Sequence, residues 1–261
     1  MGTENKQSLT KAMLGDYMNE PNRGFTPEIT DDPITNVFND FKIWFDWVKQ
    51  NGYENVPFEE YENEYDKFRL KYDADARYYN QALNDPIAAL RGDTVTSFYT
   101  VYKEMLRRIT GVTYNKSDNP FDELIDKRNE QGFKEVNDIF TEFAELNHTG
   151  GNFMLLPHRE MNVDRYRCSQ DRIDKSLYEC FPGGKLAKYF GISEEMQLEN
   201  LIEWIRSQNL EMMFVDSKVN RDNIIPLNKN NPFVTYKKMT VDELSEFLDS
   251  AVELIKKRTP V

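Results

Sequence analysis

The sequence predicts a predominantly helical α+β fold, in which several amphipathic helices pack on a small β-sheet. Apolar residues recur at intervals of three and four along most of the chain, which is the spacing that gives a helix one buried face. One short apolar run, residues 153–156, lies between a glycine pair and a proline and has the length of a buried strand. The 261 residues are 39% hydrophobic and 13% aromatic, which favours a folded core over disorder.

The chain is expected to consist of an arm and one domain. Prolines and glycines punctuate residues 1–33 without a sustained apolar period, which predicts an irregular N-terminal arm. Residues 34–261 are expected to form a single helix-rich globular domain. Its first helix is predicted over 34–50, before Asn51-Gly52, and a second over 58–72 has aromatic residues on one side and acidic residues on the other.

The middle of the chain continues the helical pattern. Asp93 occupies the position of an N-cap that accepts backbone N–H groups, and the apolar stripe after it ends at Gly111, so a helix is predicted over 94–110. Further helices are predicted from their apolar periodicity and flanking turn residues over 121–130, 133–147, 169–181 and 193–208, with Ser193 as a cap.

The C-terminal part carries the clearest helix start. Thr240-Val241-Asp242-Glu243 has the pattern of a capping box, in which the first and last side chains satisfy each other's backbone N–H groups. The helix that follows is expected to end at Lys256-Lys257-Arg258, where cations interact favourably with the helix dipole. Before it, residues 212–215 and 224–227 are predicted to be short extended segments.

Composition limits the classes of function. A formal net charge of −12 argues against general nucleic-acid binding, which needs clustered cations, whereas an acidic surface is suited to solubility or to a cationic surface on another protein. No apolar run is long enough to cross a membrane, and the polar N-terminal residues lack a signal-peptide core, which predicts a cytoplasmic protein. Cys168 and Cys180, without a CxxC pattern, are expected to be reduced thiols, and neither a metal nor a cofactor is predicted.

Residues 148–172 have an unusual local composition for this acidic chain. They contain both histidines, a glycine pair and four arginines around the predicted strand, and the ends of strands are places where scaffolds present chemistry. The candidate catalytic residues are His148, Asn152 and Asp171. The candidate ligand-binding residues are His158, Asn162, Arg165, Arg167 and Arg172.

Simpler structural roles compete with these candidates. Histidines of this kind are more often surface residues than catalytic bases, and the glycine pair is suited to a helix-to-strand turn. The arginines have two alternatives. They form an anion pocket with bidentate donors, or they form internal ion pairs with neighbouring acids such as Asp164 and Asp171, and the second alternative is favoured.

The same segment resembles a family of small bacterial and phage proteins that is defined as a domain of unknown function. The residues that carry the resemblance are Gly151-Asn152, Phe153 to Pro157, Asn162, Arg165, Asp171-Arg172-Ile173-Asp174, Leu177 and Glu179-Cys180. The resemblance covers about 30 residues and implies a bacterial or phage origin. It implies no activity, because the family has none assigned.

A weaker resemblance connects GGNFMLLPHREMN to the IGNLTLL segment of HNH-type nuclease domains in defence proteins. It implies that Asn152 and Asn162 lie in a metal-finger region. Such nucleases need a histidine on a preceding strand to activate water beside a metal, and residues 110–147 contain none. An active nuclease is therefore not expected, and at most a degenerate one remains.

Three functional hypotheses follow. The favoured one is a noncatalytic acidic protein-interaction factor of phage or mobile-element origin, which acts against host defence or regulates a host protein. The alternative is an enzyme or a nucleotide- or anion-binding protein with its site in residues 148–172, which requires those side chains to converge in one pocket. The third is a homo-oligomeric scaffold.

Overall fold

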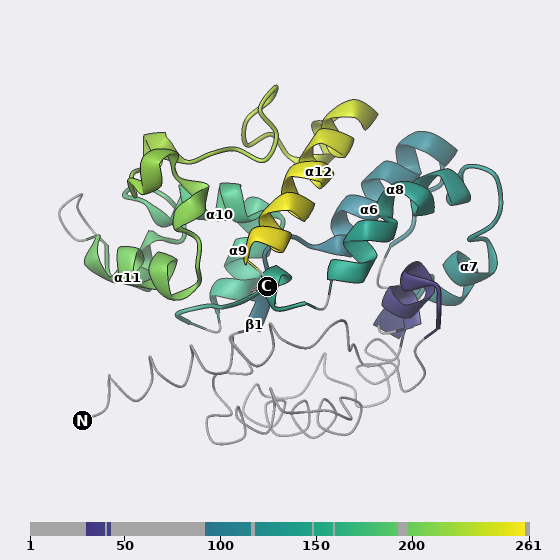
Figure 1. Ribbon diagram of the computed structural model, residues 1–261, viewed down its shortest axis with the longest axis horizontal. Coiled ribbons are helices and arrows are strands. Elements are labelled where there is room, and N and C mark those ends of the chain that lie inside the picture. Colours follow the sequence, from purple (N-terminus) through teal and green to yellow (C-terminus); the bar gives the residue numbers. More distant parts are fainter. Residues whose placement is uncertain are drawn as a thin grey trace, which may run out of the picture.

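A long C-terminal helix runs across the middle of the molecule (Figure 1). The computed structural model describes residues 30–39, 41–42, 92–115, 118–147, 149–158, 160–192 and 198–258. The central helix is α12 (Val241–Arg258), with α6 (Phe98–Thr110), α7 (Phe121–Asp126) and α8 (Phe133–Leu146) on one side and α9 (Met161–Ser169), α10 (Ile173–Cys180) and α11 (Glu199–Ser207) on the other. The predicted helical α+β fold is confirmed.

The sheet consists of two short strands in the described part of the chain. β2 (Phe153–Leu155) is the strand predicted from the apolar run, and it pairs antiparallel with β1 (Gly92–Thr94), which the sequence did not indicate. Asp93 lies opposite Met154 inside this ladder. The prediction that Asp93 caps a helix over 94–110 is therefore wrong, because the residue is part of a strand.

The cap of α6 is Ser97, four residues after Asp93. Its side-chain oxygen accepts a hydrogen bond from the backbone N–H of Thr100 at 3.4 Å. The predicted end of the helix is confirmed, because Gly111 adopts the left-handed conformation at φ 73° and its N–H donates to the carbonyl of Arg107.

Side chains close the outer edge of β2, where a third strand would otherwise pair. The N–H of Leu155 donates to Oε1 of Gln208 at 2.7 Å, and the indole N–H of Trp204 donates to the carbonyl of Leu155 at 2.7 Å. Nη2 of Arg258 donates to the carbonyl of Phe153 at 2.9 Å. The sheet ends at two strands because these donors and acceptors satisfy its backbone groups.

An aromatic cluster fills the core between α6 and α8. The ring of Phe98 lies 5.5 Å from that of Phe140 and 5.7 Å from that of Tyr102, measured between centroids. Phe38 adds a ring from a helical segment at residues 33–39, which begins the helix predicted over 34–50. Residues 43–50 of that prediction, and the whole helix predicted over 58–72, lie outside the described residues.

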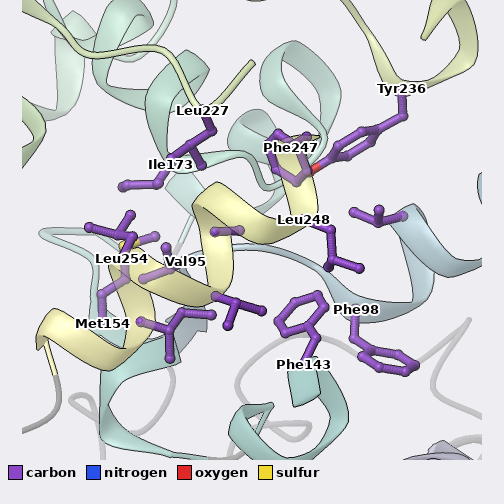
Figure 2. Close-up of a cluster of buried hydrophobic side chains, with 14 of the residues drawn as sticks. Val95, Phe98, Phe143, Met154, Ile173, Leu227, Tyr236, Phe247, Leu248 and Leu254 are labelled. Atoms are coloured by element: carbon purple, nitrogen blue, oxygen red, sulfur yellow. The ribbon is translucent and has the colours of Figure 1, made fainter. Parts of the chain in front are cut away.

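Helix α12 joins the two sides of the core (Figure 2). Its start is the predicted capping box: the N–H of Thr240 donates to Oε2 of Glu243 at 2.8 Å, and the N–H of Glu243 donates to Oγ1 of Thr240 at 3.2 Å. The apolar residues that recur at helical spacing along it are buried and are Leu244, Phe247, Leu248, Ala251 and Ile255. In Figure 2 the side chains of Phe247, Leu248 and Leu254 lie among those of Phe98, Phe143, Val95, Met154 and Ile173.

Four other predicted segments differ from the structure. The helix expected over 169–181 begins only at Ile173, as α10, because Gln170 and Asp171 adopt positive φ angles of 55° and 59° and break the helix. Helix α9, which ends at this break, was not predicted. Helix α11 begins at Glu199, and the predicted cap Ser193 lies outside the described residues. The extended segments expected at 212–215 and 224–227 meet only in the bridge between Phe214 and Ile224.

Short 3-10 turns occupy most of the remaining connections. They are η3 (Gly150–Asn152), η4 (Ala187–Phe190), η5 (Glu211–Met213), η6 (Val215–Ser217), η7 (Arg221–Asn223) and η8 (Tyr236–Lys238). Within the described ranges, no helix combines the length and the apolar character needed to cross a lipid bilayer.

Candidate functional site

The described part of residues 148–172 forms a turn, strand β2 and helix α9, and several of its polar side chains point inward. Asn152 is fully buried. Its side-chain carbonyl accepts from the N–H of Thr96 at 3.2 Å, and its amide donates to the carbonyl of Asn147 at 3.0 Å. Asn152 therefore ties the chain before α6 to the end of α8. His148 lies outside the described residues.

Arg165 occupies the centre of a buried polar network. Its Nη1 contacts the carboxylate of Asp93, and its Nε donates to Oγ of Ser176 at 2.8 Å. Its Nη2 donates to the carbonyls of Val95 at 3.0 Å and Asp171 at 2.7 Å. Burial works to lower the pKa of Arg165, but the nearby carboxylates of Asp93 and Asp171 outweigh it and raise that pKa, so the guanidinium stays charged.

Arg172 forms a second buried network at the start of α10. Its Nε and Nη2 donate to the two carboxylate oxygens of Asp174 at 3.1 and 2.7 Å, and its Nη1 contacts the carbonyl of Val234. The guanidinium carbon lies 4.8 Å from the ring centroid of Phe247 and 5.5 Å from that of Tyr236. Asp174 accepts in turn from the backbone N–H of Leu227 at 3.0 Å, so this network connects α10, α12 and the segment between them.

Two of the candidate arginines thus take part in internal ion pairs. The side chains of Arg165 and Arg172 have no exposed surface, and their donors are directed to Asp93, Asp174 and backbone carbonyls. The structure brings Arg165 and Asp171 together, with 3.7 Å between Nη1 and Oδ1. The candidate residues that the structure describes do not all face the same way, because Asn152, Arg165 and Arg172 are buried whereas His158 and Arg167 are exposed.

The opposite side of α9 faces outward and is partly apolar. Val163 is 52% exposed and Tyr166 is 48% exposed, and the side chain of Arg167 next to them is 73% exposed. On its inward side the same helix buries Arg165 and Ser169 together with Met161. The usual arrangement of an amphipathic helix is therefore largely reversed. We call Val163, Tyr166 and Arg167 the α9 outer face.

A fixed cluster of polar and aromatic groups lies beside the α9 outer face. Oδ2 of Asp164 accepts from Nζ of Lys188 and from the hydroxyl of Tyr189, both at 2.7 Å. Hydrogen bonds from Lys188 and then Tyr189 lower the pKa of Asp164, which stays ionised. The ring of exposed His158 stacks on Tyr189 with 5.6 Å between centroids, and Asn162 is half-buried on α9.

Arg258 is a buried arginine that the sequence analysis assigned to the helix dipole. The helix ends at this residue as predicted, but the side chain is buried, with 1% of it exposed. Its guanidinium donates to the carbonyl of Gly151, to that of Phe153 at 2.9 Å and to that of Gln208 at 2.9 Å. Burial lowers the pKa of Arg258 to about 9, so the group is charged at pH 7 and the three carbonyls solvate it. Arg258 comes three residues after Ile255 and seven after Ala251, so it continues the buried stripe of α12, and this spacing is the sequence signal that distinguishes it from Lys256 and Lys257.

The remaining candidate chemistry is limited in the part of the chain that the structure describes. Cys168 and Cys180 are free thiols, as expected. Among the described residues, no three His, Cys, Asp or Glu side chains gather in a way that would hold a metal ion. Comparisons of the chain with protein-family models, with curated proteins and with solved structures find no match in any of the three.

Proposed function

We propose that this protein is a noncatalytic interaction factor that binds another protein through the α9 outer face. The observation that carries the proposal is the exposure of Val163 and Tyr166 beside Arg167 on a helix that buries an arginine and a serine. Tyrosine and arginine are enriched among the residues that dominate binding energy in protein interfaces. Exposed apolar side chains that lie together on one helix face favour a partner surface.

The neighbouring cluster supports the same function. Lys188 and Tyr189 are both hydrogen-bonded to Asp164, so the rim of the α9 outer face is held in place before a partner binds. A preorganised surface loses less side-chain entropy on association. The formal charge of −12 further favours a partner with a cationic surface around the contact.

We also propose, from the resemblance of residues 151–180 to the bacterial and phage family, that the protein originates from a phage or mobile element. It acts in the cytoplasm, against a host defence system or as a regulator of a host protein. The alternative of an anion-binding enzyme has less support, because Arg165 and Arg172 direct their donors to internal partners. Degenerate nuclease activity has no support from the described residues.

The test is affinity purification of the tagged full-length chain from bacterial cells, followed by mass spectrometry. The wild-type chain is expected to recover one stoichiometric partner, and the double variant Val163→Ser, Tyr166→Ala is expected to lose it. Val215→Ser is the matched control, because Val215 is 51% exposed on η6, outside α9.

A photo-crosslinking amino acid at position 166 gives an independent readout, since it is expected to form a covalent link to the same partner. Equal recovery by the wild-type chain and the α9 double variant would show that the α9 outer face is not the binding surface. Recovery of no stoichiometric protein by any variant would contradict the interaction function itself.

A further inference from the structure

A groove of about 410 Å³ lies between α12 and the segments that precede it. Its apolar lining consists of Met212, Met213, Ile225, Pro226, Leu227 and Leu254. Ser250 and four charged residues, Lys229, Asp249, Glu253 and Lys257, complete the lining. The volume lies within the range of roughly 300–1,000 Å³ that is usual for binding sites. We call this feature the α12 groove.

The charges at the rim have a defined order. Asp249, Glu253 and Lys257 are spaced four residues apart and therefore lie along one side of α12. The backbone N–H of Lys229 lies 3.4 Å from Oε1 of Glu246, which places Lys229 at the N-terminal end of this row. Along the rim, a lysine lies at each end and the two carboxylates of Asp249 and Glu253 lie between them. Glu253 approaches Lys256 at 3.5 Å, and within the described ranges the four rim charges are not paired with one another.

The backbone N–H groups of the groove wall disfavour an extended peptide as the occupant. The N–H of Ile225 donates to the carbonyl of Met213 at 2.8 Å, and that of Leu227 donates to Asp174 at 3.0 Å. Pro226 has no N–H, and the N–H of Lys229 is directed to Glu246. An extended peptide that binds by adding a strand needs a row of open backbone groups. The N–H groups of three wall residues are already bonded and Pro226 has none, which disfavours strand addition and favours an occupant that satisfies its own backbone.

An α-helix meets that requirement, because its backbone hydrogen bonds are internal. From Asp249 to Lys257 the groove side of α12 covers about 12 Å, or slightly more than two helical turns, at about 1.5 Å per residue. Methionine side chains in the lining adapt their shape to different apolar partners. Two adjacent carboxylates in the middle of the rim favour a cation at the centre of the bound helix.

We propose that the α12 groove binds an amphipathic helix of a partner protein. The helix places apolar residues at positions i, i+3 or i+4, and i+7 against the methionine-rich lining, and a central lysine or arginine against Asp249 and Glu253. This site adds a second contact to the interaction function proposed above. It does not depend on the α9 outer face.

The probe is a displayed library of 16-residue peptides with apolar residues at helical spacing and random residues elsewhere, selected against the full-length chain. The enriched peptides are expected to carry lysine or arginine near the centre of the helix. In nuclear magnetic resonance spectra of the chain labelled at its methionine methyl groups, the signals of Met212 and Met213 are expected to shift on peptide addition. The signal of Met212 is identified by its loss in the variant Met212→Leu.

Three variants locate the site. Glu253→Lys is expected to weaken the selected peptide about fivefold or more, since an exposed attraction becomes a repulsion. Ser250→Trp is expected to abolish binding, because the indole fills the groove. Glu145→Lys carries the same charge reversal on α8 at an exposed position and is expected to leave the affinity unchanged. Glu253→Lys keeps the test decisive if Ser250→Trp does not fold.

Several results would overturn the proposal. One is that the selection enriches no peptides with a central cation at helical spacing. Another is that the selected peptides bind the wild-type chain and Glu253→Lys with equal affinity. A concentration-dependent dimer that Ser250→Trp abolishes would identify a second copy as the occupant, and a small molecule retained in native mass spectra of wild type but not of Ser250→Trp would identify a ligand site. The α9 double variant separates the two proposals, because it is expected to bind the peptide normally.

Discussion

The fully buried side chains of Arg165, Arg172 and Arg258 connect parts of the chain that have little regular structure between them. A guanidinium offers five donors in fixed directions, and each of these three reaches backbone carbonyls of loops or strand ends. The loop carbonyls gain hydrogen-bond partners that a strand or helix would otherwise supply. Each buried arginine is also a charge without water around it, so its stability in the core depends on these partners.

Replacing Arg165 is expected to destabilise the fold strongly. Arg165→Ala leaves the carboxylate of Asp93 unpaired and is expected to lower the free energy of unfolding by roughly 3–5 kcal/mol. Arg167→Ala, two residues away and exposed, is expected to change it by less than about 0.5 kcal/mol. Urea titration followed by circular dichroism measures both.

A second variant identifies the cause. Adding Asp93→Asn to Arg165→Ala removes the unpaired charge and is expected to restore part of the loss. Equal stabilities for the Arg165 and Arg167 variants would mean that the buried network does not hold the fold.

The two cysteines are expected to differ in reactivity. Burial, and then the proximity of Cys168, raises the pKa of Cys180 well above its usual value. Burial, and then Glu179, raises that of half-buried Cys168 to a smaller extent. Because the thiolate is the nucleophile, Cys180 is expected to stay unlabelled by a disulfide reagent at pH 8 until the protein unfolds, while Cys168 reacts slowly. Absorbance of the released thiol measures both rates.

The variant Cys180→Ser serves as the control for this assignment. Its native labelling rate is expected to match that of wild type, and in urea it is expected to lose one of the two reactive thiols. Rapid native labelling that disappears in Cys180→Ser would show that Cys180 is accessible.

The helices whose bounds depend on residues close together in the chain could be predicted from the sequence. The apolar period identified α8 and α12, and the capping box at Thr240 identified where α12 begins, since both signals lie within a few residues of the structure they produce. Strand β1 has three residues and owes its pairing to β2, about 60 positions later, so nothing local indicated it. For that reason Asp93 was assigned to a cap.

The division between α9 and α10 escaped prediction for a related reason. Gln170 and Asp171 adopt positive φ angles, a conformation that is usually indicated by glycine. For the candidate site, the sequence shows a concentration of polar residues over 148–172. The sequence did not reveal which of these residues are buried. Both sides of α9 carry polar residues, so the buried side is set by the segments that pack against the helix.

The capping box gives a prediction for α12 itself. Thr240→Ala removes the acceptor for the N–H of Glu243 and is expected to lower the free energy of unfolding by about 1 kcal/mol. Thr240→Ser retains the hydroxyl and is expected to be nearly neutral. Chemical denaturation compares the two, and a serine variant as unstable as the alanine variant would show that the lost methyl group, and not the cap, matters.

For the whole molecule, α12 is the element that both halves share. It packs against α6 and α8 on one side, and through Arg258 it contacts η3, β2 and the end of α11. Side chains of α12 lie among those of Phe143 on one side and Ile173 on the other, so both halves bury apolar surface against this helix. The expectation of a single domain over 34–261 stays a prediction that unfolding experiments address.

Unfolding of the described core is expected to occur in one cooperative step. Arg258→Met leaves buried carbonyls unpaired and is expected to lower the stability by roughly 2–5 kcal/mol while the transition remains single. Differential scanning calorimetry measures this, with equal calorimetric and van 't Hoff enthalpies as the criterion. Two resolved transitions in the variant would mean that the halves on either side of α12 are independent.

The closed edge of β2 has a consequence for the synthesis of the protein. The side chains that cover it follow their strand partners by 49, 53 and 105 positions. A ribosome adds about 5–20 residues per second, so roughly 5–20 s pass between the emergence of β2 and that of Arg258. During this interval the nascent strand exposes backbone groups to which another chain can add. Translation speed therefore sets how long each new molecule is vulnerable to misassembly.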